Sequence, residues 1–256
     1  MSDVDKTRLQ AQFARSLTTY RQAAQVQAMM AETLMAALAE TTAIRHFPRI
    51  LELGCGDGLL TSRIEETLSY GQLTLVDIVP ACADRHRHRR HARFVPGDME
   101  TMPLPEADLA LAGAAFQWAA DLPGLLRRLQ RLLSRDGLLA FSTFGPDNFR
   151  EIAALTGRSL PYPSLADLVA LLQASHFTVL MAREEHRALL FPNAEAVLVH
   201  LRETGVNGVK QGKAWTRQTL KDFSERYRQN HAGADGRLPL TYHPLWVVAQ
   251  KHQTAP

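Results

Sequence analysis

The sequence predicts an α/β fold in which helices cover both faces of a mostly parallel sheet. From about residue 45 onward, short apolar runs typical of buried strands alternate with amphipathic segments typical of helices. Parallel neighbours in a sheet need right-handed crossover connections, and the intervening helices supply them. The 256 residues, 46% of them hydrophobic, can bury a sizeable core as one or two domains.

The predicted elements follow one another in a regular order. Residues 4–38 have helical spacing, with a break near residues 16–20. Strands are then expected at 49–53, 72–77, 92–95, 108–112 and 137–143, with the clearest helices at 59–68 and 122–133. After residue 143 we expect helices at 164–174, 194–203 and 217–228, and strands at 177–183, 186–190 and 239–251. Pro244 interrupts the last strand and predicts an edge, a bend or a bulge there.

Charge and hydropathy argue against several classes of protein. The 29 Lys and Arg residues exceed the 26 acids by only three, which is too small a surplus to indicate nucleic-acid binding by the whole chain. No apolar run approaches the roughly 20 residues that a membrane span needs, and the first residues lack the pattern of a secretory signal. We therefore expect a cytoplasmic protein that binds neither membrane nor nucleic acid.

The positive charge is concentrated in residues 85–93, which we call the basic segment. It holds five arginines and three histidines in nine residues. The segment could be a solvated helix face or a surface that meets an acidic partner.

We expect no metal site. Cys55 and Cys82 are too few for a disulfide framework or a thiolate zinc site, so both are predicted to be reduced. A single histidine beside Tyr242, His243, is typical of a structural residue. The histidines of the basic segment lie among arginines that repel a cation.

A glycine-rich turn follows the first predicted strand of the α/β region. Residues 51–58 read Leu-Glu-Leu-Gly-Cys-Gly-Asp-Gly, with glycines at 54, 56 and 58 before a helix. Glycines let the backbone turn sharply and let a nucleotide-like ligand approach it closely. The dinucleotide pattern G-x-G-x-x-G would need a glycine at the position of Leu59, which disfavours hydride-transfer chemistry.

Three acids lie where the strands end. Glu52 precedes the turn, and Asp77 ends the next strand, where a carboxylate can accept both hydroxyls of a ribose. Asp98 follows the third strand, where it can accept from an adenine amino group. Together these acids indicate an adenosine-containing ligand.

The order of motifs resembles the class I methyltransferases that use S-adenosyl-L-methionine. The matching motifs are E-L-G-C-G-x-G at 52–58, an acid after the second strand, and G-D-M-E-x-x-P-L at 97–104. The resemblance implies a Rossmann-like fold with a mostly parallel seven-stranded sheet, an N-terminal helical lid and a C-terminal helical insertion. The implied divisions are a lid at 1–44, a cofactor-binding core at 45–160, a cap at 161–235 and a final strand at 236–256. The implied cofactor-binding residues are Glu52, Gly54, Cys55, Gly56, Gly58, Asp77, Ile78, Gly97, Asp98, Met99, Gly113 and Ala114.

A second resemblance covers about residues 10–251. The segments 13–20, 116–118, 140–144, 201–207 and 239–243 are similar to those of the malonyl-[acyl-carrier protein] O-methyltransferases of biotin synthesis. This similarity implies an enzyme that methylates the free carboxylate of malonyl-acyl carrier protein and releases S-adenosyl-L-homocysteine. We expect a monomer. Arg85, Arg87, Arg89 and Arg90 of the basic segment would then steer the acidic carrier protein.

The chemistry indicates which catalytic groups to expect. Methyl transfer from a sulfonium is an in-line displacement, and a carboxylate is already ionised at pH 7, so no general base is needed. Catalysis then rests on positioning and on exclusion of water. Tyr20, Gln117 and Tyr242 are the candidate neutral donors, although Tyr20 is also consistent with a core aromatic.

Several alternatives remain at this stage. A class I methyltransferase could act on a small-molecule acceptor, or it could act on RNA through the basic segment, although no aromatic platform accompanies that segment. A fold that binds the cofactor without catalysis is disfavoured by the intact turn. Which cap residues hold the thioester arm also stays open, the candidates being Arg202, Asn207, Lys210 and Lys213.

Overall fold

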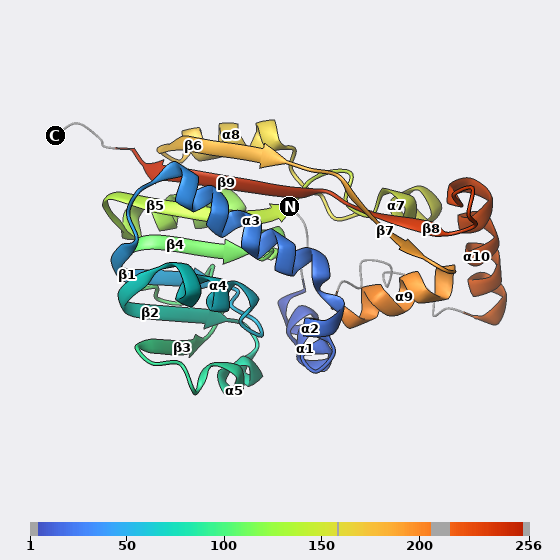
Figure 1. The fold of residues 1–256 in the computed structure, drawn as a ribbon, viewed down its shortest axis with the longest axis horizontal. Coiled ribbons are helices and arrows are strands. Elements are labelled where there is room, and N and C mark those ends of the chain that lie inside the picture. The colour runs from blue at the N-terminus through green and yellow to red at the C-terminus, as the bar shows by residue number, and fades with distance from the viewer. Residues whose placement is uncertain (1–4, 158, 206–215, 253–256) are drawn as a thin grey trace.

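A computed structural model describes residues 5–157, 159–205 and 216–252 of the chain (Figure 1). Its helices are α1 (Lys6–Ser16), α2 (Tyr20–Ala23), α3 (Gln25–Thr41), α4 (Leu59–Thr67), η1 (Pro80–Cys82), α5 (Ala83–His86), η2 (Phe116–Trp118), α6 (Leu122–Leu132), α7 (Arg150–Thr156), α8 (Leu165–Ala174), α9 (Ala194–Glu203) and α10 (Arg217–His231). Its strands are β1 (His46–Leu53), β2 (Ser69–Asp77), β3 (Ala92–Pro96), β4 (Ala107–Gly113), β5 (Leu133–Phe144), β6 (Phe177–Glu184), β7 (Arg187–Phe191), β8 (Leu238–Tyr242) and β9 (Pro244–Lys251). Over these described residues, no helix is both long enough and apolar enough to cross a bilayer.

Seven strands form the main sheet, which confirms the predicted fold class. Their order is β3-β2-β1-β4-β5-β9-β6, and β9 runs antiparallel to both of its neighbours. The internal strand β1 pairs in parallel with β2 and β4, so that Leu51 lies beside Thr74 on one side and Ala110 on the other. β2 and β3 lie on one side of β1, whereas β4 and β5 lie on the other. Open α/β sheets bind ligands where the strand order reverses in this way, which here is between β1 and β4.

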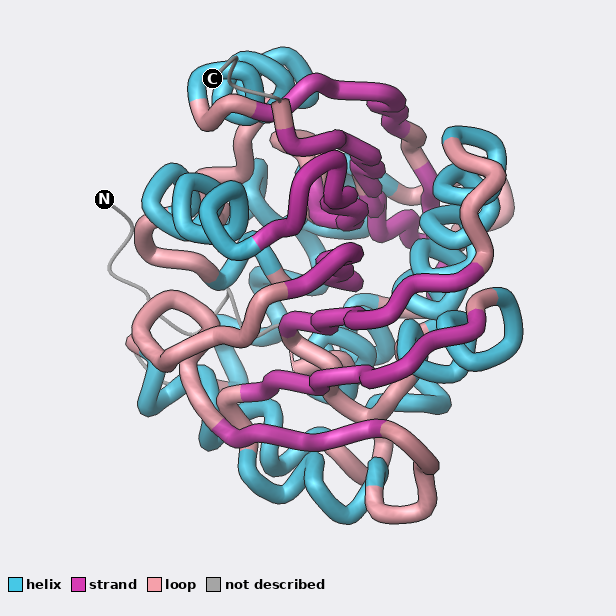
Figure 2. The backbone as a smooth tube through the Cα atoms, turned by 90° about the vertical axis from the view of Figure 1, so that its left-hand side faces the viewer, coloured by secondary structure: helices cyan, strands magenta, loops and turns pink. Residues whose placement is uncertain are grey.

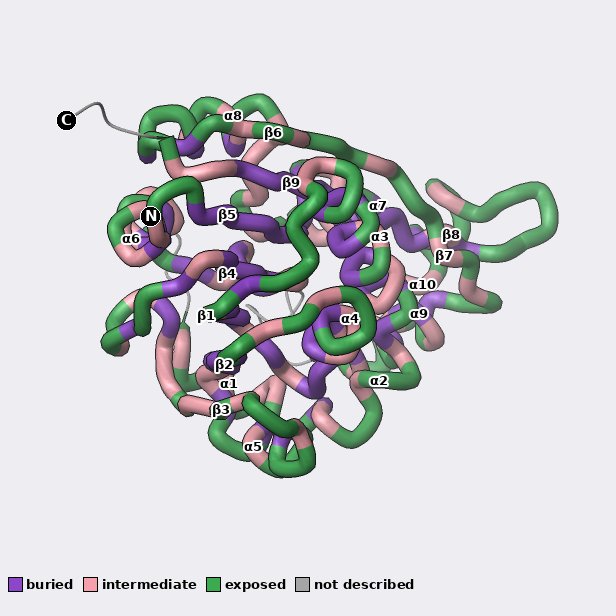
Figure 3. Tube along the Cα trace, turned by 60° about the vertical axis from the view of Figure 1, so that its left-hand side comes forward, coloured by how far each residue is buried: buried purple, intermediate pink, exposed green. Residues whose placement is uncertain are grey.

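Helices cover both faces of this sheet (Figure 2). Successive side chains of β1 point to opposite faces, so Ile50 joins the core under α3 and α4, and Leu51 joins the core under α6 and α8. Figure 3 shows the result, with buried central strands and exposure concentrated in the outer helices and turns.

The N-terminal helical region breaks where the sequence predicts. α1 is capped by Asp5, whose side chain accepts from the Arg8 amide at 3.0 Å, and it ends before the turn at residues 17–19. α3 lies on the sheet, where the indole of Trp246 donates to the Met30 carbonyl at 2.9 Å. With α3 anchored in this way, α1 and α2 lie beyond the carboxyl ends of β1 and β2 (Figure 1).

The predicted strand at 239–251 is two strands in two different sheets. β8 pairs with β7 in a separate two-stranded sheet, and β9 enters the main sheet. The break falls at His243 and Pro244, as the proline indicates, but β9 is an internal strand and not an edge. The two-stranded sheet lies with α7, α9 and α10 to one side of the main sheet, and from here on this group, and not the range 161–235, is called the cap (Figure 1).

Candidate functional site

A pocket lies at the carboxyl ends of β1, β2 and β4, beneath α1 and the turn that leads to α2. It encloses about 1020 Å³ of empty space, counting the part that opens to solvent. Its floor is the glycine-rich turn between β1 and α4, and its roof is formed by α1 residues such as Leu9 and Phe13. A nucleotide-sized ligand fits a pocket of this size and place.

The glycine-rich turn needs glycine for two separate reasons. Gly54 and Gly58 have φ angles of +72° and +89°, in the left-handed region that other residues avoid. In addition, a Cβ on Gly54 would lie 2.5 Å from the Cβ of Ala115, in the loop after β4. The turn therefore packs closely against the loop after β4 at Gly54.

Two members of the basic segment are buried beneath this turn. His86 is 4% exposed, stacks on Phe94 and contacts the Gly56 carbonyl through Nε2 at 3.0 Å. Because a carbonyl only accepts, Nε2 carries the proton, and burial lowers the pKa of His86 so that the ring stays neutral. The Arg89 side chain is 5% exposed, pairs with Glu65 and underlies Gly58. Arg89 is therefore not available to dock a partner, contrary to the expectation for the basic segment.

Acidic groups line the cofactor side of the pocket. Asp77 accepts from the amides of Gly56 and Val79, each at 2.8 Å, which holds the end of β2 against the turn. Glu52 is 1% exposed, and its Oε2 has no hydrogen-bond partner among the described residues. Burial raises the pKa of Glu52 to about 8, an effect partly offset by Thr61 and by the nearby Arg89 guanidinium. An orphaned buried carboxylate facing a pocket suits a ligand that carries donors or positive charge.

The N-terminal helices are tied to the loops around the pocket. Lys6 pairs with Asp98 at 3.0 Å and also with Glu100, and Gln10 donates to the Ile78 carbonyl at 2.8 Å. Further along, the Arg21 guanidinium lies 3.5 Å from the Asp57 carboxylate. α1 thus lies across the ends of β2 and β3, where it covers the pocket.

Aromatic side chains close the same roof. Phe13 of α1 meets Trp118 edge-to-face at a centroid distance of 5.6 Å and Tyr20 at 6.5 Å. These contacts join the N-terminal helices to η2 across the pocket. They cover this side of the pocket.

Of the three candidate neutral donors, the structure brings only Tyr20 to the pocket. Tyr20 lines it, and burial, with Asp57 and Asp77 nearby, raises the pKa of its hydroxyl so that it remains a neutral donor. Gln117 is not among the lining residues, because its amide donates to the Ala114 carbonyl at 2.6 Å and accepts from Thr143 at 3.2 Å.

Tyr242 is also absent from the residues that line the pocket. It is fully buried in β8, and its hydroxyl lies 2.6 Å from Nε2 of His200 in α9. The structure therefore places Tyr242 between the two-stranded sheet and a cap helix. Burial, and to a lesser extent the nearby phenol of Tyr20, raise the pKa of Tyr242, so that its hydroxyl stays neutral.

All but one of the predicted cofactor-binding residues line the pocket. Gly58 does not line the pocket, because it faces Arg89. The others all line it, namely Glu52, Gly54, Cys55, Gly56, Asp77, Ile78, Gly97, Asp98, Met99, Gly113 and Ala114.

Two further lining residues lie on the N-terminal helices. Lys6 carried no signal in the sequence. Gln27, which belongs to the segment that resembles the family, is buried with its Oε1 unpartnered among the described residues. Asp57 lies inside the glycine motif and could have been selected from its position alone. Asn207, Lys210 and Lys213 lie outside the described residues, and Arg202 is exposed on α9.

Comparisons with known proteins agree with this arrangement. A family profile described as "Methyltransferase domain" matches residues 51–141. The Burkholderia thailandensis 1,6-didemethyltoxoflavin-N1-methyltransferase, solved with S-adenosylhomocysteine bound, is similar in fold with a TM-score of 0.55 at 18% identity, over 96% of this chain and 88% of that one. The solved structure shares the fold, and the profile identifies residues 51–141 as a methyltransferase domain.

Curated relatives give the family. The malonyl-[acyl-carrier protein] O-methyltransferase of Porphyromonas gingivalis is 36% identical over 98% of both chains. That of Chlorobium luteolum is 37% identical over 97% of both chains. The chain belongs to the malonyl-[acyl-carrier protein] O-methyltransferase family.

Proposed function

We propose that the chain transfers a methyl group from S-adenosyl-L-methionine to the free carboxylate of malonyl-acyl carrier protein, as a step of biotin synthesis. The observation that carries the proposal is the match to this family over nearly the whole chain, lid and cap included. The acid-lined pocket supports the choice of donor. S-adenosyl-L-methionine carries a sulfonium and an ammonium, and Glu52, Asp57 and Asp77 favour positive charge.

The residues present fit this cofactor. Asp77 at the end of β2 would accept from the ribose hydroxyls, and Asp98 would accept from the adenine amino group. The unpartnered oxygen of Glu52 would receive a donor from the cofactor. Backbone groups would supply the remaining polar contacts at Gly54, Gly56, Gly113 and Ala114, with Cys55, Ile78, Gly97 and Met99 as walls.

Catalysis on this account is positioning without a general base. When bound, S-adenosyl-L-methionine supplies the methyl group and the leaving sulfur. The protein's own contribution would be to hold the acceptor carboxylate against the bound methyl donor and to exclude water. Tyr20 orients that carboxylate as a neutral donor. Gln117 and Tyr242 are positioning residues, which act through Ala114 and His200 respectively.

The substitution Tyr20→Phe should lower turnover at least tenfold and leave cofactor affinity little changed. It removes the one donor among the three candidates that lines the pocket and keeps the ring that packs on Phe13. The loss of one oriented hydrogen bond to a charged group is typically worth this much. Steady-state kinetics and calorimetric titration of the cofactor measure the two quantities. Tyr70→Phe removes a hydroxyl outside the pocket and serves as the control; equal turnover in the two variants would remove Tyr20 from the mechanism.

The exposed part of the basic segment is the proposed docking surface for the carrier protein. Arg85, Arg87 and Arg90 are exposed, and Arg85 donates to the Leu17 carbonyl at 3.3 Å in the turn after α1. The surface thus adjoins the roof of the pocket. Acidic carrier proteins would be attracted to it, which raises the association rate more than the rate of the chemical step.

Reversing charge at Arg87 and Arg90 together should slow methylation of the carrier-linked substrate at least tenfold at low salt. Methylation of malonyl-coenzyme A should change much less, since it lacks the carrier surface. The comparison is of kcat/KM for both substrates at two salt concentrations, because screening weakens the effect. Arg127→Glu with Arg131→Glu, two exposed positions on α6, makes the same change in net charge and should have little effect. Equal losses for both substrates would rule out docking there.

The function itself can be tested in cells. A bacterium that lacks its own enzyme for this step needs biotin, and expression of this chain should restore growth without it. The Gly54→Ala variant should fail to restore growth. Failure of the wild-type chain, expressed in soluble form, would contradict the proposed acceptor.

A further inference from the structure

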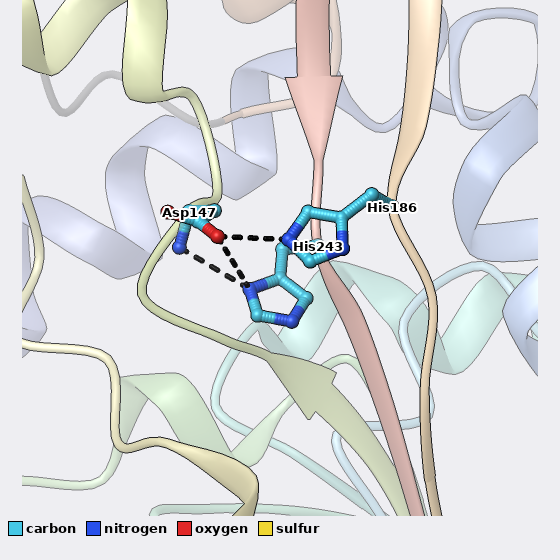
Figure 4. Close-up of side chains that lie close together, drawn as sticks. All are labelled: Asp147, His186 and His243. Carbon is cyan, nitrogen blue, oxygen red and sulfur yellow. Dashed lines mark hydrogen bonds and ion pairs between the residues drawn. The ribbon is translucent and has the colours of Figure 1, made fainter.

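Three potential metal ligands meet outside the pocket, where the chain passes between the main sheet and the cap. Asp147 lies in the loop after β5, His186 between β6 and β7, and His243 between β8 and β9. One carboxylate oxygen and one ring nitrogen from each histidine all lie within 4.8 Å of one another (Figure 4). The three residues show no regular spacing in the sequence, because each lies in a different segment that connects the main sheet with the cap.

His243 is held with one ring nitrogen available as a ligand. It is 4% exposed, and its Nδ1 accepts from the Asp147 amide at 3.2 Å. Since Nδ1 accepts, the proton lies on Nε2, which donates to Glu184 at 3.2 Å. A histidine that donates its far N–H to a carboxylate is the usual arrangement of a metal-binding imidazole. Gly145 makes room for the ring, because a Cβ there would lie 2.6 Å from Nδ1.

His186 and Asp147, the other two potential metal ligands, lie on the solvent-exposed side of His243. Nε2 of His186 lies 2.8 Å from Oδ2 of Asp147, and both side chains are about half exposed. The same Asp147 oxygen lies 4.0 Å from Nδ1 of His243. The ligand atoms of a four-coordinate zinc ion are roughly 3.3 Å apart. The separations of 2.8 and 4.0 Å lie on either side of this value.

We propose that Asp147, His186 and His243 bind a divalent transition-metal ion such as Zn²⁺. Two imidazoles and one carboxylate select a borderline ion over Mg²⁺ or Ca²⁺, and the open side leaves a position for water. The ion must displace the Asp147 amide from Nδ1, a bond at the long end of the normal range. The site departs from the expectation, based on sequence, that the chain holds no metal.

A bound metal ion would link the three segments that connect the main sheet with the cap. β6 leads into β7 past His186, and β8 leads into β9 past His243 (Figure 1). An ion held by both, and by the loop after β5, would fix the cap against the sheet. This role is independent of the cofactor pocket and of the proposed acceptor.

The test is titration of the full-length protein, freed of metal with a chelator, using Zn²⁺ in a calorimeter and Co²⁺ by visible absorption. We expect one ion per chain. His186→Gln, at an exposed position, and Asp147→Asn, at a partly exposed one, should weaken binding at least tenfold. Glu184→Gln should weaken it by about 10- to 100-fold by loosening His243. His88→Gln, an exposed histidine of the basic segment, should leave binding unchanged.

Three results would overturn the site. They are no binding at millimolar metal, the same affinity in His186→Gln as in the wild type, or a loss in His88→Gln in place of His186→Gln. The last would place the ion on the basic segment. Circular dichroism of each variant shows that it is folded, so that a loss reports ligation.

Discussion

Replacing Gly54 by alanine should reduce affinity for S-adenosyl-L-methionine roughly a hundredfold. The residue has a φ of +72°, and a new Cβ would lie 2.5 Å from the Cβ of Ala115, which itself lines the pocket. A left-handed alanine costs about 1–2 kcal/mol and overpacking typically adds 1–3 kcal/mol, so about 3 kcal/mol is expected, or roughly a hundredfold in affinity. Relief of the overlap moves the turn or the Ala115 loop, and either movement changes the pocket.

Gly157→Ala is the matched control for this substitution. Gly157 has a similar φ of +67° at the end of α7, and a Cβ there meets nothing within 4 Å. It should lower stability by about 1 kcal/mol and leave cofactor affinity unchanged. Calorimetric titration of both variants, below their unfolding temperatures, separates backbone strain from the clash at the turn. Equal affinities would show that the close approach of Gly54 to Ala115 has no part in cofactor binding.

Glu52→Gln should weaken cofactor binding tenfold to a hundredfold at pH 8 and should reduce the pH dependence of that binding. The carboxylate is 1% exposed with one oxygen unpartnered among the described residues, so it can pair with a donor of the cofactor. Burial raises its pKa to about 8, so below pH 8 the free protein holds a proton that a cationic ligand must displace. Affinity of the wild type should therefore rise by up to tenfold per pH unit from about pH 6 to 8 and then level off.

The same substitution should affect stability in the opposite direction. Between the ordinary pKa of 4.5 and about 8, the native state retains a proton on Glu52 that the unfolded chain has lost. Stability of the cofactor-free protein therefore falls as pH rises through this window, and Glu52→Gln should recover on the order of a few kcal/mol at pH 8. Burial also raises the pKa of Asp77, so the difference between variant and wild type is the quantity to measure. A variant with the wild-type pH profile, or one destabilised at pH 8, would show that Glu52 does not carry this charge.

The sheet could be predicted from sequence because its signals are local. Each strand from β1 to β5 contains a short, mainly apolar run, and the glycine motif places the carboxyl end of β1 within a residue. α7 was not predicted, since its seven residues begin at Arg150 after a residue of left-handed conformation and lack a side-chain cap. The division of 239–251 between two sheets was also beyond prediction, because pairing partners are not encoded in a single strand.

The site could be predicted where residues belong to a contiguous motif. Glu52 and Asp77 fall at strand ends, and the parallel sheet brings those ends together. The role of Arg89 could not be predicted from sequence. A charged residue in the basic segment is expected on the surface, but the structure shows the Arg89 side chain buried beneath Gly58. Lys6 was missed for the converse reason, as its contact with Asp98 spans 92 residues of chain.

The most direct measurement is transfer of labelled methyl groups from S-adenosyl-L-methionine by the purified protein. Malonyl-acyl carrier protein, malonyl-coenzyme A and bulk RNA are offered separately, and the product is treated with mild base, which cleaves a methyl ester. The account predicts base-labile label on the carrier-linked malonyl group, with the highest kcat/KM for that substrate. Cofactor binding without methylation of any of the three would contradict the proposed acceptor, as would label on RNA alone.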